Sequence, residues 1–85
     1  MKVTVRLGEP LWREVGDRDV AVELPESATV ADLLTRLAAL HPSLRPWLDG
    51  EEVPVTVFLD DSVADARTSL RDGDRPHLAW ALAGG

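Results

Sequence analysis

A single amphipathic helix is the feature that most limits how this chain of 85 residues can fold. The segment "TVADLLTRLAALHP" repeats apolar side chains at the spacing of one helical stripe: Val30, Leu33, Leu34, Leu37 and Ala38. Thr29 is the expected N-cap, with Asp32 completing a short capping box. Pro42 prevents continuation, so the helix is predicted to end near Leu40 or His41. One helix cannot bury such a stripe alone, so it must pack on a sheet.

Alternating apolar and polar residues on both sides of the helix indicate the strands of that sheet. The predicted strands are Lys2–Leu7, Asp19–Leu24, Pro54–Asp60 and Pro76–Leu82, with a short strand and a turn in the weakly patterned segment Ser62–Leu70. Leu11–Val15 is expected to form one helical turn that Gly16 ends, with Trp12 covering an edge of the core. Ser43–Glu52 is interpreted as a loop with a turn at Asp49–Gly50.

Two further turns complete the expected chain path. Asp60–Asp61 follows the third strand, and Arg71–Asp74 carries a tight-turn sequence. The order is therefore strand, strand, helix, strand, a short irregular stretch and strand.

The composition excludes several classes of function. There are no cysteines, so disulfides, thiolate metal sites, iron–sulfur clusters and cysteine nucleophiles are absent. No metal site is expected, because His41 and His77 stand apart and the acidic residues Asp60, Asp61 and Asp65 have the character of a solvated turn. The net charge of −6 argues against nucleic acid and favours a positively charged protein partner. With no membrane-length apolar run and no leader-like segment, a cytoplasmic location is expected.

The sequence ends in "ALAGG", directly after the last predicted strand. A terminal diglycine is either a frayed end or a narrow tether whose carboxylate reacts, since glycine adopts backbone angles closed to other residues. We expect residues 83–85 (Ala83, Gly84 and Gly85) to form a flexible tail. In the preceding strand, Leu78, Trp80 and Leu82 share one face. Leu78 is expected in the core. Trp80 and Leu82 are candidate partner-binding residues, and a Trp80 that closes the core is an equal alternative for that residue.

This order of elements and its closing diglycine resemble the ubiquitin-like β-grasp fold, and more closely the small sulfur carriers of the MoaD/ThiS type. The resemblance covers nearly the whole chain, and its matching pieces are "VTVRL", "ATVADLLTRLAALHP", "VTVFLDD" and "SLRDGD" followed by a strand ending in "AGG". It implies an α+β fold in which a mixed four- to five-stranded sheet packs on one main helix, with residues 1–85 as a single domain and an extended C-terminal tail. Asp60 and Asp61 stand where family members often have Asn, and "AWAL" stands where they often have Pro, which bears on the partner recognised.

The same resemblance implies a carrier and not an enzyme. An E1-like adenylyltransferase would use ATP to adenylate the Gly85 carboxylate, and a sulfur donor would convert the acyl-adenylate to a thiocarboxylate. A sulfur-accepting biosynthetic enzyme would then take the sulfur for molybdopterin, thiamin, cysteine or tRNA thiolation. The carrier itself needs no cofactor and is expected to be a monomer when free.

Two alternatives remain open from the sequence. A ubiquitin-like modifier would use the same activated tail to form isopeptide bonds with other proteins. Self-linked chains are nearly ruled out in that case, because Lys2 is the only lysine. A non-conjugating β-grasp interaction domain would carry the diglycine incidentally, and its function would survive truncation of the tail.

Overall fold

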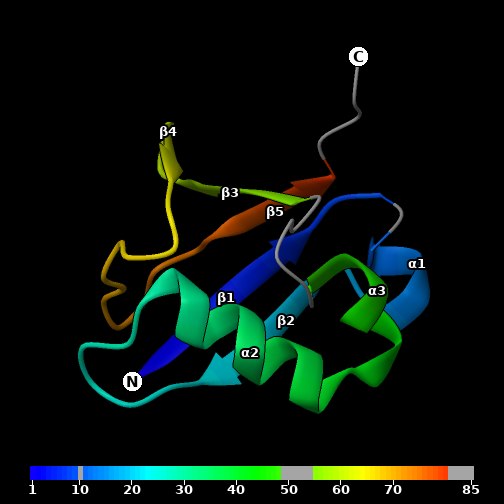
Figure 1. Ribbon diagram of the computed structural model, residues 1–85, viewed down its shortest axis with the longest axis horizontal. Coiled ribbons are helices and arrows are strands. Elements are labelled where there is room, and N and C mark those ends of the chain that lie inside the picture. The colour runs from blue at the N-terminus through cyan, green and yellow to red at the C-terminus, as the bar shows by residue number, and fades with distance from the viewer. Residues whose placement is uncertain (10, 49–54, 81–85) are drawn as a thin grey trace.

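The computed structural model describes residues 1–9, 11–48 and 55–80. Five strands form one sheet in the order β2-β1-β5-β3-β4. Their bounds are β1 Lys2–Leu7, β2 Asp19–Glu23, β3 Val55–Leu59, β4 Ser62–Ala64 and β5 His77–Trp80. The first and last strands, β1 and β5, run parallel at the centre, whereas the other neighbouring strands are antiparallel (Figure 1). The predicted mixed sheet is therefore confirmed.

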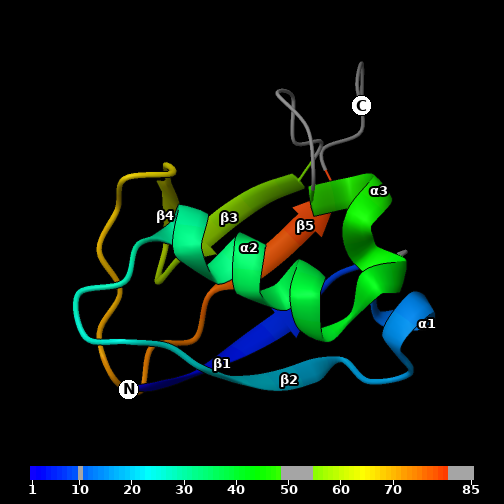
Figure 2. The ribbon, with the colours of Figure 1, turned by 60° about the horizontal axis from the view of Figure 1, so that its bottom comes forward.

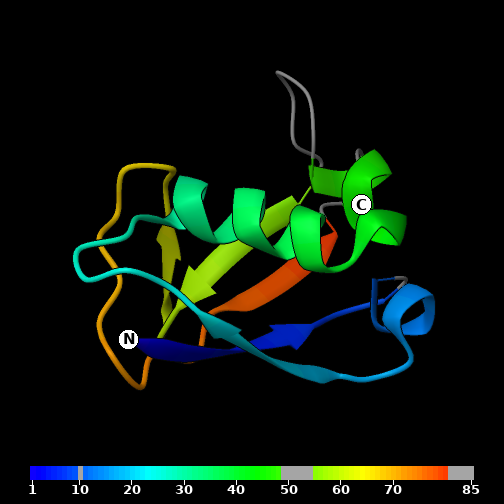
Figure 3. The ribbon, with the colours of Figure 1, turned by 90° about the horizontal axis from the view of Figure 1, so that it is seen from below.

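Helix α2 (Val30–Leu40) crosses one face of this sheet and leaves the other face open (Figure 3). Three short helical segments, α1 (Leu11–Val15), η1 (Pro42–Leu44) and α3 (Arg45–Leu48), gather at one end of the layer (Figure 2). The strands β1 and β5 point toward that end. The expected arrangement of a sheet on one main helix is confirmed.

The core lies between the sheet and α2. On the sheet side, Val3 and Val5 are completely buried, as the alternation of β1 predicts. On the helix side, Leu33 and Leu37 are completely buried, whereas Leu34, predicted in the same stripe, is only half-buried. No polar or charged residue among those described is buried, so this core depends on apolar packing.

The ends of α2 also follow the sequence prediction. The Thr29 side chain accepts a hydrogen bond from the backbone of Asp32, and the Asp32 carboxylate accepts one from the backbone of Thr29, which completes the capping box. The first two helical N–H groups, of Val30 and Ala31, donate to carbonyls in the segment after β4, each at 3.0 Å. Hydrogen bonds therefore hold the start of α2 to the loop that follows the edge strand β4.

The predicted loop over residues 43–52 is wrong in its first half. Pro42–Leu44 forms a 3-10 turn and Arg45–Leu48 forms α3. Leu44 and Leu48 are buried one helical turn apart, and this i, i+4 pair was a helical signal that the proline-rich composition masked. A proline in the first turn suits a helix start, since the missing N–H has no partner there. The turn expected at residues 49–50 lies outside the described residues.

The remaining turns agree with prediction. Gly16, at a φ of +92°, ends α1 in the left-handed region that favours glycine. Asp60–Asp61 joins β3 to β4, and a turn within Arg71–Asp74 leads toward β5. No helix in the described parts of the chain has the length and apolar character needed to cross a membrane.

Candidate functional site

The last strand, β5, pairs in parallel with β1, and this pairing determines where β5 ends. Three N–H groups on alternate residues of this segment, from Thr4, Arg6 and Gly8, donate to carbonyls of the β5 segment at 3.0, 2.8 and 2.8 Å. The last of these bonds joins Gly8 to Leu78. Both strands therefore finish at the same end of the sheet, beside α1. The predicted partner-binding residue Leu82 and the predicted tail residues Ala83, Gly84 and Gly85 follow β5 and lie outside the described residues.

Trp80, the final residue of β5, is exposed over 41% of its surface, whereas Leu78 is completely buried. The prediction that Leu78 belongs to the core is confirmed. Trp80 pairs with Val55 on β3 and does not close the core as a buried residue. Its assignment as a partner-binding residue, together with that of Leu82, stays a prediction.

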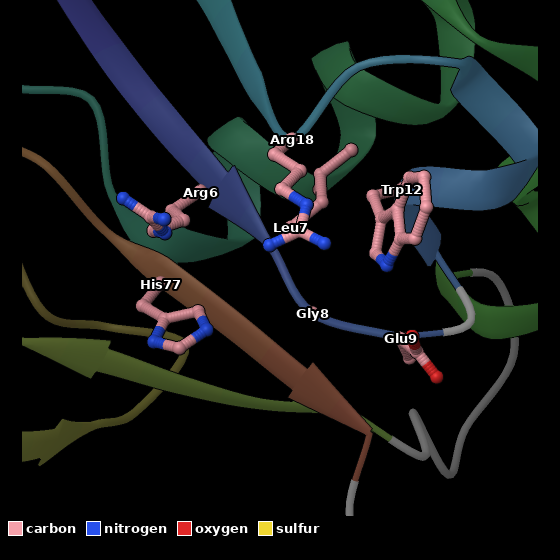
Figure 4. A pocket seen from close by; sticks show the side chains of 7 residues that line it. All are labelled: Arg6, Leu7, Gly8, Glu9, Trp12, Arg18 and His77. Carbon is pink, nitrogen blue, oxygen red and sulfur yellow. The ribbon is translucent and has the colours of Figure 1, made fainter.

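An open hollow of about 190 Å³ lies at this same end of the sheet. Figure 4 shows the residues that line it: Arg6, Leu7, Gly8, Glu9, Trp12, Arg18 and His77. Arg6 and His77 lie side by side on β1 and β5, and Arg18 lies between Arg6 and the Trp12 ring in this view. The hollow therefore combines three basic side chains with one indole.

Backbone hydrogen bonds fix the segments that carry these side chains. The Leu7 N–H donates to the Arg18 carbonyl at 2.7 Å, and the Trp12 N–H donates to the Gly8 carbonyl at 3.2 Å. A Cβ on Gly8 would lie 3.1 Å from the Leu78 carbonyl oxygen, so glycine permits the close approach of this segment to β5. The basic groups therefore project from a rigid frame.

The charges around the hollow are incompletely paired. The guanidinium carbons of Arg13 and Arg18 lie 5.3 and 4.8 Å from the centre of the Trp12 ring, within cation–π range. Arg13 also pairs with Glu9 at 3.1 Å, and this is the only ion pair among residues 1–9, 11–48 and 55–80. Arg6 and Arg18 consequently have no carboxylate within ion-pair distance in the described parts of the chain.

A second hollow of about 180 Å³ continues along the open face and shares Arg6 and His77 with the first. Thr4, Asp19 and Arg75 complete its lining. Asp19 lies opposite Arg6 in the β1–β2 register without forming an ion pair with it. The open face next to the last strand is therefore basic, although the chain as a whole is acidic.

The acidic and histidine residues considered from the sequence lie in a turn or on the surface. Asp65 accepts hydrogen bonds from the Arg67 N–H at 2.8 Å and from the Thr68 hydroxyl at 3.3 Å, which stabilises a turn. The described residues contain no group of three acidic or histidine side chains placed to hold a metal ion. His77 is exposed, and its ring lies 6.3 Å from that of Phe58.

Sequence reasoning did not find the basic hollow. Its residues come from β1 and the segment after it, from α1, from the residue before β2 and from β5, and they meet because β5 inserts beside β1. The available signal was the placement of Arg6 and His77 on the outward positions of two strands, which acquires meaning only once those strands are known to be neighbours.

Comparison with solved structures shows how widely this architecture is shared. SAMP1 from Haloferax volcanii is 27% identical, with a TM-score of 0.88 and complete coverage of both chains. A Pyrococcus furiosus protein assigned as subunit 1 of a molybdopterin converting factor is 23% identical, with a TM-score of 0.84 over 96% of this chain and 99% of its own. A chain of the Amycolatopsis orientalis BexX/CysO complex is 23% identical, with a TM-score of 0.73 over 98% and 99% of the two chains.

These likenesses, the mixed sheet and its single main helix define a small ubiquitin-like β-grasp protein. No sequence among curated proteins matches the chain. The model of the ThiS family matches residues 5–85, so the chain belongs to the ThiS family. It is thus a member of a group of small sulfur carriers and modifiers, and the resemblance drawn from the sequence is confirmed.

Proposed function

We propose that this protein is a sulfur carrier whose Gly85 carboxylate is the reactive group. The observation that carries the proposal is the family match, which extends through the diglycine to residue 85. A carboxylate oxygen attacks the α-phosphorus of ATP on an E1-like adenylyltransferase and pyrophosphate leaves. Sulfide released by a donor then attacks the carbonyl carbon, the bond from that carbon to the AMP oxygen breaks, and loss of the sulfur-bound proton leaves the thiocarboxylate.

The carrier presents its terminal carbonyl and the partner enzyme supplies the catalytic groups. No phosphate-binding glycine-rich loop occurs in the sequence, so the charge that develops on the phosphates must be stabilised by the enzyme. The fold supports this division of labour, because β5 is held at the sheet centre by hydrogen bonds to β1. Five fully extended residues after Trp80 span at most about 17 Å, which is the reach into a partner's active site.

Incubation with an adenylating enzyme, ATP and a sulfur donor tests the proposal directly. The intact protein is expected to gain the mass difference between one sulfur and one oxygen at its C-terminus. Deleting Gly85 is expected to abolish activation, since the new carboxylate lies about 3.5 Å short of the nucleotide. The same deletion should change the free energy of unfolding by less than about 0.5 kcal/mol, because the core described above does not include it.

Gly84→Ala serves as an intermediate variant, because its methyl group widens the tether and restricts its backbone angles. It is expected to be activated more slowly than the full-length protein and faster than the deletion variant. If the full-length protein forms neither an adenylate nor a thiocarboxylate with any adenylating enzyme of its own genome, the sulfur-carrier proposal is wrong.

Protein modification is the second candidate function, because the fully covered structure at 27% identity is SAMP1, described as a small archaeal modifier protein. Both functions begin with the same adenylate and differ in the fate of the activated tail. Covalent adducts with other proteins, detected by the diglycine remnant left on their lysines after digestion, would favour modification. A free thiocarboxylate consumed by a biosynthetic enzyme would favour the carrier.

A further inference from the structure

We propose that the groove between α2 and the edge strand β4 binds an extended segment of a partner protein, with aliphatic side chains in its middle and basic side chains at its ends. The segment adds to the sheet as a further strand beside β4. This groove, called the edge groove below, has a volume of about 260 Å³. It is lined by residues of α2, β3, β4 and the segment after β4: Val30, Leu34, Val55, Thr56, Val57, Val63, Ala64 and Ala66.

The edge groove exists because β4 is too short to cover the flank of α2. The strand holds three residues, and it pairs with β3 over residues 57–59 only. Leu34 belongs to the apolar stripe of α2 and is nevertheless only half-buried, and Val63 is exposed over 68% of its surface. Figure 2 shows β4 at the edge of the sheet, near the start of α2. Aliphatic side chains at the groove thus remain for a partner to cover.

The backbone of β4 offers a place for one more strand. β4 is the last strand in the sheet order, with β3 as its one neighbour among the described strands. In an antiparallel ladder, alternate residues direct their N–H and C=O groups toward the neighbour, and the others direct them away. Within the described ranges 1–9, 11–48 and 55–80, residues 62–64 make no backbone hydrogen bonds outside that ladder. An extended segment can therefore bond to β4 while its alternate side chains enter the groove.

The lining of the edge groove suits aliphatic side chains better than a small ligand. Its volume lies below the roughly 300–1,000 Å³ that is typical of small-molecule pockets. Thr56 is the only polar residue among the described residues that line it, so few polar groups are present to orient a small molecule. Burial of valine, isoleucine or leucine side chains against this lining is favourable, because it removes apolar surface from water.

Acidic side chains at both ends of β4 determine the charge of the partner segment. Asp60 and Asp61 precede the strand and Asp65 follows it, and all three residues are exposed. None of the three forms an ion pair within the part of the chain that the structure describes. Arg67 is the one basic residue between positions 60 and 67, so carboxylates dominate this edge. Lysine or arginine at the ends of the bound segment complements them.

A second copy of this chain is the less suitable occupant. Antiparallel pairing of two β4 strands brings Asp61 of each copy near Asp65 of the other, and like charges across a strand pair are destabilising. The net charge of −6 on each chain adds to this repulsion. Charged residues beside an edge strand also protect it against such self-pairing. The edge groove therefore selects a partner of the opposite charge.

The first experiment follows the backbone amide signals of the ¹⁵N-labelled full chain. The probe is a peptide of alternating valine and threonine between flanking lysines, and its counterparts have glutamate for lysine or serine for valine. The lysine–valine peptide is expected to shift the signals of β4 and to leave those of β2, the opposite edge strand, unchanged. An equal response to either counterpart, a response at β2 alone, or no response would overturn the proposal. Shifts at β4 that appear on raising the protein concentration without peptide would assign the groove to a second copy and would also overturn it.

N-methylation of the lysine–valine peptide tests strand addition itself. Only one edge of the bound peptide faces β4, so methyl groups on the N–H groups of one set of alternate residues are expected to abolish binding. Methyl groups on the other set point away from β4 and are expected to leave binding measurable. Equal results for the two sets, whether loss or retention, would contradict strand addition.

Neutralisation of the flanking carboxylates tests the charge of the groove. The double variant Asp60→Asn with Asp61→Asn is expected to lower the affinity for the lysine–valine peptide by about three- to tenfold at low salt, and by less as salt is added. Asparagine suits position 60, where φ is +56°. The control, Asp17→Asn with Asp19→Asn, removes two exposed carboxylates at β2, and the affinity should stay within about twofold. Equal losses would indicate a general charge effect and would overturn the assignment of the site.

Adenylation separates this proposal from the proposed function. The described lining of the edge groove does not include β5, so deleting Gly85 is expected to leave the affinity for the lysine–valine peptide within a factor of about two. A wild-type chain that binds the peptide but is never adenylated would contradict the sulfur-carrier function and leave the edge groove standing. A wild-type chain that is adenylated but does not bind the peptide would overturn the edge groove and leave the carrier function standing.

Discussion

The two faces of the sheet differ in what their side chains do. On the face covered by α2, residues such as Val5 and Leu37 are completely buried and make only apolar contacts. The other face is left open by α2 (Figure 3). Arg6 and His77 on that face are exposed, and Val63 on the edge strand β4 is exposed over 68% of its surface. The same strands β1 and β5 contribute to both faces because successive side chains point in opposite directions.

This difference separates folding from recognition within single strands. The closed face carries the packing that stabilises a small core, and in a chain of this size that packing tolerates few losses. The open face carries charge and exposed apolar area that the core does not require. Substitutions on the closed face are therefore expected to change stability, and substitutions on the open face are expected to change partner binding.

The largest effect is expected from Leu37→Ala on the closed face. Leu37 is completely buried, so its truncation should lower the free energy of unfolding by about 2–5 kcal/mol. Leu40→Ala in the same helix is the matched control, because Leu40 is 43% exposed, and its cost should stay below about 1 kcal/mol. Urea denaturation followed by circular dichroism measures both, and equal costs would contradict the separation of the two faces.

The sequence was sufficient to predict the elements that pack this closed face. The helical stripe, the cap at Thr29 and the inward positions of β1 are local patterns, and local spacing determines them. The parallel pairing of β1 with β5 joins residues some seventy positions apart, as in the contact of Arg6 with His77, and no local pattern encodes it. The family resemblance supplied that topology.

The basic hollows on the open face were not predictable for the same reason. Arg6 was a polar residue on an alternating strand, and the net charge of the chain favoured a positively charged partner. Only the assembled sheet brings Arg6, Arg18 and Arg75 around shared hollows. The net charge of the chain is a sum over all its residues, so it could not reveal a local patch of the opposite sign.

A smaller effect on folding, with a clear effect on binding, is expected from Trp80→Ala. Trp80 is 41% exposed at the end of β5, so complex formation with the activating enzyme should weaken by about 2 kcal/mol, the scale of an interface hot spot. Thermal stability should fall by less than it does for Trp47→Ala, because Trp47 packs half-buried against the core. Large destabilisation with unchanged binding would instead assign Trp80 to the core.

The smallest effect is expected from Val63→Thr on the edge strand β4. Threonine keeps the β-branched shape that suits a strand, and a residue that is 68% exposed loses little buried area, so the free energy of unfolding should change by less than about 0.5 kcal/mol. Thermal unfolding measures this stability. A clearly larger loss would place Val63 in the packing of the edge strand and would contradict its separation from the core.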